Sequence, residues 1–391
     1  MIKSVWQPPQ LRVGGTLEEH RHATWLELFY DLVFVAAIAE LAHSLSKEAS
    51  LSGFLIFVSL FIPVWWSWIG ATFYNTRFDC DHDLGHRLLT LAQMAGIVVL
   101  AVNVHHGIGE SSIGFALSYV AIRSVTIFEY LRAGYYIPIA RPLTTRFALG
   151  FTLAAGLWLV SVLVPVPWRY GFWALGMVVD LTTPWLVGKL HIQFPPHLSH
   201  IPERLGLFTI IVLGESILGV VRGVSEEQWE VYPALEALLG LSIAFSLWWI
   251  YFDSVDNSPL KTARAGRFRI GLLWTYSHLP LVIGLAATGV GVEHLVLSDS
   301  GVGLPLTERW LLCGPIALCL LTLAAIHLIT CTLGKICRKV LALYRLGAAA
   351  FVLALVIIGE NLLPVGLMAL VAAACAIPVM LDLQKGSGNS F

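Results

Sequence analysis

The sequence has little charge for its length. Aspartate, glutamate, lysine and arginine together make up 13% of the 391 residues, whereas hydrophobic residues make up 57% and the mean hydropathy is +0.77. Soluble globular domains carry about 25% charged residues. The composition therefore excludes a soluble domain and indicates a polytopic membrane protein in contact with a lipid bilayer.

An excess of positive charge is also lacking. The 24 Lys and Arg residues are matched by 25 Asp and Glu residues, which gives a net charge of -1, and no basic tail or stripe is present. Proteins bind a phosphate backbone mainly through clustered Lys and Arg. Nucleic acid is therefore not an expected partner.

The chain lacks the motifs of soluble enzymes and of disulfide-bonded secreted proteins. It contains no P-loop, no GxSxG elbow and no HExxH helix. Residues 1–24 are polar and lack the basic and apolar regions of a signal peptide, so the first apolar segment is expected to be a retained span. The cysteines form no CxxC pair and are interpreted as reduced packing residues: Cys80, Cys313, Cys319, Cys331, Cys337 and Cys375.

What the chain has instead is a succession of long apolar runs. A helix needs about 20 residues to cross the hydrocarbon core, and only helices satisfy their own backbone hydrogen bonds there without closing a barrel. We predict an all-α transmembrane bundle of about 12 spans. Their approximate limits are 25–45, 53–74, 88–107, 113–132, 147–166, 170–189, 204–222, 235–254, 270–289, 310–333, 346–363 and 365–383.

The basic residues of the loops predict the orientation. When alternate loops are assigned to opposite sides, 19 Lys and Arg residues fall on one side and four on the other. Loops rich in Lys and Arg face the cytoplasm. Both termini are therefore expected to be cytoplasmic.

The two halves of the chain show a similar order of features. Paired tryptophans end a span in each half, at residues 65–66 and 248–249, and an acidic loop follows each pair. We predict two tandem six-helix repeats of the same orientation. The expected divisions are a cytoplasmic N-terminal segment at 1–24, repeats at 25–190 and 204–383, a cytoplasmic linker at 191–203 and a tail at 384–391.

Carboxylates within the predicted spans are the main candidates for function. Each charged group at this depth costs about 2.5–3.5 kcal/mol on insertion scales, so such groups face the bundle interior, pair with each other or line a path. One hypothesis is an ion or proton site between the first and seventh spans. The alternative is interhelical ion pairing with Arg123, Arg132 or Arg204. The acidic set is Glu27, Asp31, Glu40 and Glu215.

Further polar residues accompany this set. Gln93 and His278 occupy similar places in the third and ninth spans, and Glu360 lies near the end of the eleventh. In the segment 79–86, His82 and His86 are four residues apart and would suit zinc if the segment were helical; a solvated acidic loop is the alternative. The sequence identifies no cofactor.

Two segments resemble the signature segments of the bacterial low-temperature-requirement A (LtrA) family. They are Trp25-Leu-Glu-Leu-Phe-Tyr-Asp-Leu-Val-Phe-Val, preceded by His22, and the run 196–216 that ends in Val-Leu-Gly-Glu-Ser. The resemblance covers nearly the whole chain and implies a multi-pass protein of the bacterial inner membrane. The positions that carry the family pattern are His22, Glu27, Asp31, His200, Glu203, Arg204, Gly206, Gly214, Glu215 and Ser216.

These observations favour a transporter or channel for a small ion or solute, in which buried acidic residues take part. A protein from another class is the alternative: an intramembrane enzyme acting on a lipid-like substrate, or an accessory protein of membrane stress. A homo-oligomer is compatible with either hypothesis.

Overall fold

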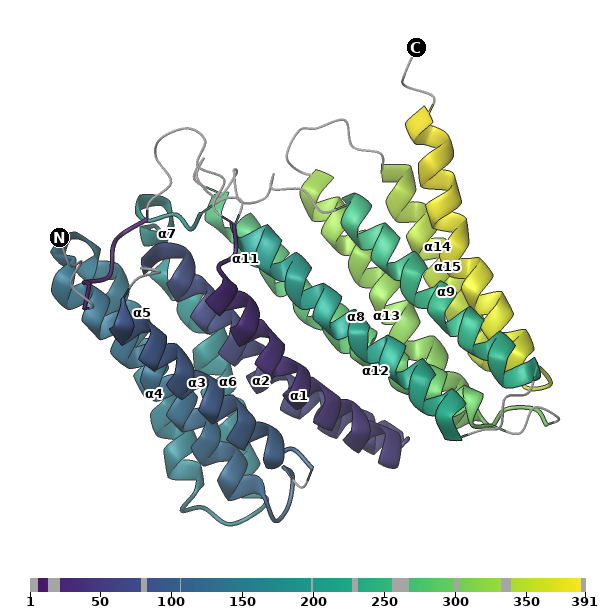
Figure 1. The fold of residues 1–391 in the computed structure, drawn as a ribbon, viewed down its shortest axis with the longest axis horizontal. Helices are drawn as coiled ribbons and strands as arrows, with labels where there is room; N and C mark the ends of the chain where they lie inside the picture. Colours follow the sequence, from purple (N-terminus) through teal and green to yellow (C-terminus); the bar gives the residue numbers. More distant parts are fainter. Residues whose placement is uncertain are drawn as a thin grey trace. The chain divides into compact units, whose positions relative to one another are not determined.

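The computed structural model describes residues 6–12, 22–78, 83–105, 107–197, 200–226, 231–254, 267–298, 302–331 and 339–387, and the ordered elements among them are helices (Figure 1). This confirms the predicted all-α class. The helices are α1 (Trp25–Lys47), α2 (Leu51–Phe78), α3 (Leu84–Val102), α4 (Ser112–Tyr136), η1 (Pro138–Ala140), α5 (Arg141–Ser161), α6 (Trp168–Val187), α7 (Leu190–Gln193), α8 (His200–Glu226), α9 (Val231–Ser254), α11 (Phe268–Tyr276), α12 (His278–Val296), α13 (Leu306–Cys331), α14 (Lys339–Ile358) and α15 (Pro364–Ser387).

Within the described residues, 11 helical segments are long and apolar enough to cross a membrane. α11 and α12 count as one of them, from Phe268 to Val296. The predicted span at 170–189 is present as helix α6, but it is not among the 11. The physical reason is its mean hydropathy, which Asp180 and the following Thr182, Thr183 and Pro184 lower.

The chain divides into two compact units. Unit 1 comprises residues 1–41, 59–207 and 257–272, and unit 2 comprises residues 42–58, 208–256 and 273–391. Helices α1, α2, α8 and α11 each contribute residues to both units. The predicted repeat boundaries at 190 and 204 remain a prediction.

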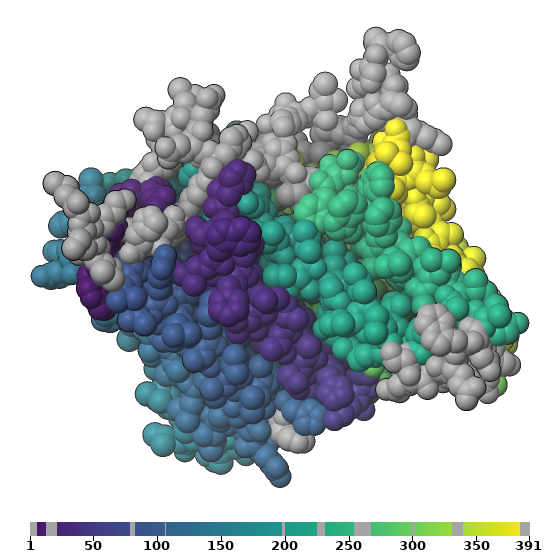
Figure 2. Space-filling model, viewed as in Figure 1, coloured from purple at the N-terminus to yellow at the C-terminus, as the bar shows by residue number. Residues whose placement is uncertain are grey.

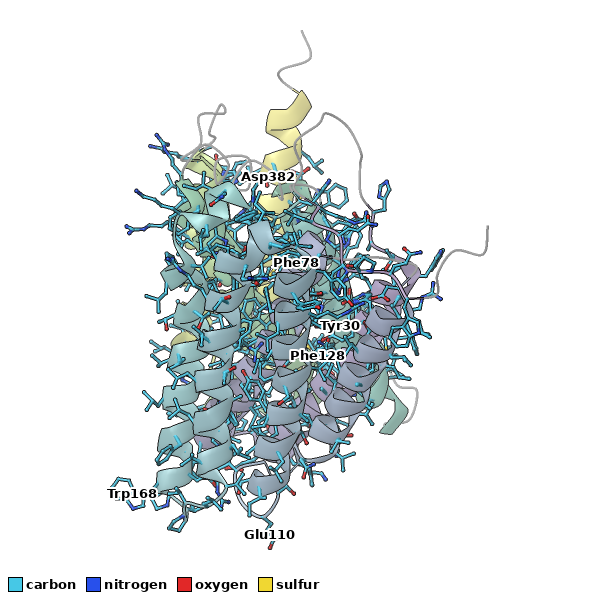
Figure 3. The ribbon with its side chains drawn as sticks, turned by 90° about the vertical axis from the view of Figure 1, so that its left-hand side faces the viewer. Tyr30, Phe78, Glu110, Phe128, Trp168 and Asp382 are labelled. Carbon is cyan, nitrogen blue, oxygen red and sulfur yellow. The ribbon has the colours of Figure 1, made fainter. Side chains whose placement is uncertain are left out.

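In unit 1, α3 packs against α4, α4 against α5, and α5 against α6 (Figure 1). Their core is aromatic: Tyr130 stacks on Phe147 with ring centroids 4.9 Å apart, and Tyr74 meets Tyr130 edge to face at 5.2 Å. Figure 3 shows Tyr30 midway along the helices and Phe78 nearer one end. Aromatic pairs of this geometry stabilise a core beyond the area they bury.

A buried ion pair joins three helices of unit 1. Arg123 on α4 lies 3.3 Å from Asp180 on α6, and both side chains are fully buried. The Tyr119 hydroxyl donates to Asp180 and accepts from Arg123, while Arg123 also donates to the Trp66 carbonyl of α2. One guanidinium is thus matched by one carboxylate, an arrangement suited to holding helices together.

Unit 2 contains an unusually close approach between α8 and α12. A Cβ atom added at Gly219 would lie 2.4 Å from the Gly289 carbonyl oxygen, and one added at Gly289 would lie 2.8 Å from the Ser216 Cα. Small residues let membrane helices approach through their backbones. The glycines at 219 and 289 therefore set the spacing between α8 and α12.

Replacing Gly219 with alanine is expected to destabilise the protein by about 1–3 kcal/mol, because the added methyl group meets backbone that cannot rotate away. Gly214 on the same helix provides the control, since a Cβ there meets nothing within 4 Å. Thermal unfolding in detergent micelles compares the two variants. Equal effects of Gly219→Ala and Gly214→Ala would contradict the close packing.

The outward side chains of α1 are large and apolar. Trp25 is 89% exposed, and Phe29 and Leu32 are each more than half exposed. α1 is the purple helix that reaches the surface in Figure 2. Such exposure is costly in water but not in hydrocarbon. This face is therefore suited to contact with lipid.

His191, on the short helix α7 outside the spans, predicts a pH dependence of stability. Its Nδ1 accepts from Arg77 Nη2 at 3.0 Å, and its Nε2 donates to the Pro184 carbonyl at 2.8 Å. Burial, followed by the positive charge of Arg77, lowers the pKa of His191 to about 3. An unfolded histidine has a pKa of about 6.5.

The unfolded chain therefore binds a proton between about pH 6.5 and 3 that the folded chain does not. Above about pH 6.5 the contribution of His191 to the free energy of unfolding is fully present. As the pH is lowered from about 6.5 to 3, the free energy of unfolding decreases by at most about 1.4 kcal/mol per pH unit from this one group. A pH series of unfolding in detergent measures the slope, and His191→Gln should flatten it. The same slope in both proteins would refute this role of His191.

Candidate functional site

Four of the predicted site residues meet in the interior of unit 1. They are Glu27 and Asp31 on α1 and His200 and Arg204 on α8, and Trp68 on α2 joins them. We call this group, together with Thr76 of α2, the Arg204 cluster. Its four charged or titratable side chains are at most 2% exposed.

Arg204 lies between the two carboxylates. Its Nη1 is 3.0 Å from Glu27 Oε1, and its Nη2 donates to Asp31 Oδ1 at 2.5 Å. Asp31 Oδ1 also accepts from the Trp68 indole at 2.6 Å. A planar guanidinium can serve two carboxylates at once. Arg204 therefore links both acids of α1 to α8.

His200 extends the cluster from Glu27 to α2. Its Nε2 lies 3.1 Å from Glu27 Oε2, and its Nδ1 lies 3.1 Å from Thr76 Oγ1. The Thr76 hydroxyl also donates to the Thr72 carbonyl at 2.7 Å. Both ring nitrogens of the buried imidazole are thus engaged with oxygen atoms.

Local sequence spacing explains how the chain builds this cluster. Glu27 and Asp31 are four residues apart on α1, and His200 and Arg204 are four apart on α8, so each pair shares one helix face. Glu27 also helps to begin α1, because its backbone N–H donates to the Thr24 hydroxyl and its Oε2 accepts from the Thr24 N–H. This reciprocal pattern is a capping box.

Among the residues that define the cluster, the charges do not balance without a proton. Glu27 and Asp31 carry two negative charges when ionised, and Arg204 carries one positive charge. A net charge buried in an apolar medium is costly. One proton, on His200 or on a carboxylate, makes the cluster neutral.

The hydrogen bonds of His200 also indicate where an added proton would lie. When the Thr76 hydroxyl donates to the Thr72 carbonyl, its oxygen accepts from His200 Nδ1. His200 Nε2 then faces Glu27 Oε2 at 3.1 Å, and a hydrogen bond between them requires a proton on the imidazolium or on the carboxylic acid. If the proton leaves, the hydroxyl can turn and donate to Nδ1 instead. The cluster therefore has two self-consistent hydrogen-bond states.

Two further predicted residues lie at the edge of this site. Glu203, whose side chain is 31% exposed, accepts from the Ala23 N–H at 3.2 Å. His22 lies 3.4 Å from Glu203 and is 79% exposed. The side chains of His22 and Glu203 are thus partly exposed, whereas those of the Arg204 cluster are buried.

The tyrosine Tyr30 lies close to the same group on α1. Its hydroxyl is buried and is within electrostatic range of Asp31, Arg204 and also Glu129 of α4. Glu129 in turn accepts from Gln93 Nε2 at 2.9 Å and lies 3.6 Å from His86. The predicted polar residue Gln93, on α3, therefore makes an interhelical hydrogen bond to α4 within unit 1.

Glu215 and Ser216 belong to a different group, in unit 2. Glu215 Oε1 accepts from Arg222 Nη2 at 2.7 Å, and Arg222 Nε donates to Glu293 Oε2 at 2.9 Å. The Ser216 hydroxyl donates to the Leu285 carbonyl at 2.9 Å. Within unit 1, Glu27 and Asp31 contact Arg204, and within unit 2, Glu215 contacts Arg222. A site shared by the first and seventh spans stays a prediction.

The other predicted residues lie elsewhere. Glu40 is exposed on α1, and Glu360 is exposed in the turn after α14 rather than inside a span. His278 Nδ1, at the start of α12, lies 2.9 Å from the Trp274 carbonyl oxygen of α11. Arg123 pairs with Asp180, as described above. None of these four residues is brought to the Arg204 cluster by a described contact.

No metal-binding group of three or more His, Cys, Asp or Glu side chains occurs among the residues described. The predicted segment 79–86 is only partly covered, because residues 79–82, including His82, lie outside the described ranges. His86 is described and approaches Glu129. The zinc hypothesis for this segment therefore stays a prediction.

Sequence reasoning missed several members of both groups. Trp68 and Thr76 were not among the expected site residues, although they are eight residues apart on α2 and so share a face. Arg222, the last residue of the predicted span at 204–222, was not among them either. Its position seven residues, or two helical turns, after Glu215 is the spacing that could have identified their ion pair.

Comparison with known proteins identifies a family whose matched range includes the helices that form the Arg204 cluster. Residues 22–381 match the family described as bacterial low temperature requirement A protein (LtrA), a range that contains every member of the Arg204 cluster. An uncharacterized protein of Rhizobium meliloti (strain 1021) is 29% identical over 316 residues, which cover 72% of this chain and 74% of that protein. With its membrane-spanning helices, the chain is a multi-pass membrane protein, and it belongs to the bacterial low temperature requirement A family.

Proposed function

We propose that the protein is a transporter for a small ion or solute in the bacterial plasma membrane, with both termini in the cytoplasm, and that the Arg204 cluster binds and releases the coupling proton. The observation that carries the proposal is the buried hydrogen bond between His200 Nε2 and Glu27 Oε2, together with the Thr76 hydroxyl, which can accept from His200 Nδ1 when the pair holds an extra proton and donate to it when the proton has left.

A proton suits this cluster better than a metal cation does. Arg204 already occupies Glu27 Oε1 and Asp31 Oδ1, so the oxygens that would ligate a cation face a guanidinium. A proton needs only one acceptor pair, and His200 and Glu27 provide it. Histidine is the side chain whose charge ordinarily changes nearest to neutral pH.

Release of the proton would change both charge and hydrogen bonding at the junction of three helices. His200 is on α8, Glu27 on α1 and Thr76 on α2. A ligand or proton shifts a conformational equilibrium only through a difference in its interactions with the two states. Proton occupancy of this cluster supplies such a difference, because the unprotonated cluster carries a buried net charge.

The test uses purified protein in proteoliposomes that enclose a pH-sensitive dye. Alkali cations, halides, amino acids and carboxylates are added outside one at a time, and the internal pH is followed. At least one addition should change the internal pH with wild-type protein, and Glu27→Gln and His200→Gln should abolish the change. Glu360→Gln, at an exposed acid in a turn, should leave it intact.

Retention of the full pH response by a folded Glu27→Gln protein would overturn the proton role of the cluster. If wild-type protein shows no response to any addition and none to an imposed pH gradient, the transport proposal fails. Turnover of a lipid-like substrate without flux would then favour the intramembrane enzyme instead.

A further inference from the structure

A second carboxyl group, in unit 2, has a different character. Glu236 on α9 is 0% exposed, and among the described residues neither of its carboxylate oxygens has a hydrogen-bond or ion-pair partner. Glu215 and Glu293 of the same unit both pair with Arg222. Glu236 is thus a buried acid without the counter-charge that these neighbours have.

Glu236 faces the interior of the unit. It belongs to the buried stripe of α9 that continues through Gly240, Ile243 and Leu247, at the spacing of one helix face. One turn further on, a Cβ at Gly240 would meet Val292 of α12 at 2.6 Å and Met368 of α15 at 3.6 Å. The side chains that face Gly240 are thus apolar, with Val220 of α8 as the third.

The charged and titratable groups on the helices packed against α9 bind other partners. α9 packs against α12, α13 and α15. The described partners are Arg222 for Glu293, Ser46 for His294, Trp274 for His278, Ser298 for Glu308, the Val356 carbonyl for Arg309 and Arg345 for Asp382. His327 of α13 lies within electrostatic range of Asp382.

An ionised carboxylate in this position would be very unfavourable. Burial of an isolated charge costs several kcal/mol even after the protein relaxes, and such groups neutralise instead. A neutral carboxylic acid avoids that cost, although its hydroxyl still forgoes a hydrogen bond. A glutamate at a position where an aliphatic residue would pack better implies that the carboxyl group is used.

We propose that Glu236 is a proton-binding site of unit 2, which carries its proton at neutral pH and is open to modification by apolar carbodiimides. The proposal does not rest on the transport proposed for the Arg204 cluster.

The expected reaction follows from the protonated state. The carboxyl group transfers its proton to a carbodiimide nitrogen while its oxygen bonds to the central carbon, which forms an O-acylisourea. Migration of the acyl group from oxygen to nitrogen then gives an N-acylurea. Nothing leaves, so Glu236 gains the mass of one reagent molecule. An ionised carboxylate paired with arginine has no proton to give and should react far more slowly.

Infrared spectroscopy of the full-length protein in lipid measures the protonation directly. The wild-type minus Glu236→Gln difference spectrum at pH 7 should contain the carbonyl band of a protonated carboxylic acid, shifted in heavy water. A water-exposed glutamate with a pKa of about 4.3 would be ionised at that pH. A carboxylate band in place of the acid band would overturn the proposal.

Labelling with dicyclohexylcarbodiimide, followed by peptide mapping, gives a second test on wild-type protein that needs no variant to fold. The label should lie on Glu236, should be lost in Glu236→Gln and should persist in the matched control Glu293→Gln. Label confined to other carboxylates would refute the assignment. Neither readout requires transport, so failure here leaves the proton role of the Arg204 cluster untouched.

Discussion

Replacing Arg204 with methionine is expected to destabilise the folded protein by about 3–5 kcal/mol, the usual cost of breaking a buried ion pair from one side. The substitution keeps an apolar stem of similar length but leaves Glu27 and Asp31 buried without their guanidinium. The remaining support for Asp31 would be the Trp68 indole at 2.6 Å. Thermal unfolding in detergent micelles measures the loss.

A matched set of variants separates charge from packing at this position. Adding Glu27→Gln and Asp31→Asn to Arg204→Met removes the stranded charges and should recover most of the lost stability, because complete removal of a buried ionic group is often nearly neutral. Arg204→Lys keeps the charge but loses the fork that serves two carboxylates, so an intermediate loss is expected. If the triple variant is no more stable than Arg204→Met, packing rather than charge explains the effect.

The helices could be predicted because the length and composition of each apolar run are local properties of the sequence. Apolar runs such as the one that becomes α13 have the length and composition of a span whatever lies beside them. The family pattern likewise marked Glu27, Asp31, His200 and Arg204 as site candidates before their contact was known. Their residue types at four-residue spacing already placed each pair on one face.

The pairing of those faces could not be predicted, because it is not local. Asp31 and Arg204 are 173 positions apart in sequence. The sequences of their two helices do not indicate that Arg204, rather than Arg123 or Arg132, is the partner of Asp31. The same limit explains why Glu215 was grouped with Glu27. The two glutamates occur in similar apolar runs, yet their partners, Arg222 and Arg204, lie in different units.

Glu236 shows a second kind of limit. Its place in the buried stripe of α9 could have been read from the spacing to Gly240 and Leu247. What the spacing cannot reveal is the absence of a counter-charge, since that depends on which helices surround α9. Burial follows from local periodicity, whereas isolation follows from tertiary packing.

The Arg123 and Asp180 pair provides the internal comparison for the proposed function. Here one arginine meets one carboxylate, with Tyr119 between them, so the group is neutral without an added proton. The Arg204 cluster has the same burial but one carboxylate more. If proton exchange depends on that imbalance, the balanced pair should matter for stability and not for coupling.

Asp180→Asn is therefore expected to destabilise the protein by about 3–5 kcal/mol, because it leaves Arg123 as a buried cation whose described acceptors, among them the Tyr119 hydroxyl and the Trp66 carbonyl, are all neutral. Adding Arg123→Met should restore much of that stability. Per folded molecule, the double variant should retain the pH response of proteoliposomes that Glu27→Gln abolishes. Loss of that response in the stable double variant would mean that a balanced ion pair also takes part in coupling, and charge imbalance could then no longer distinguish a proton site from a structural one.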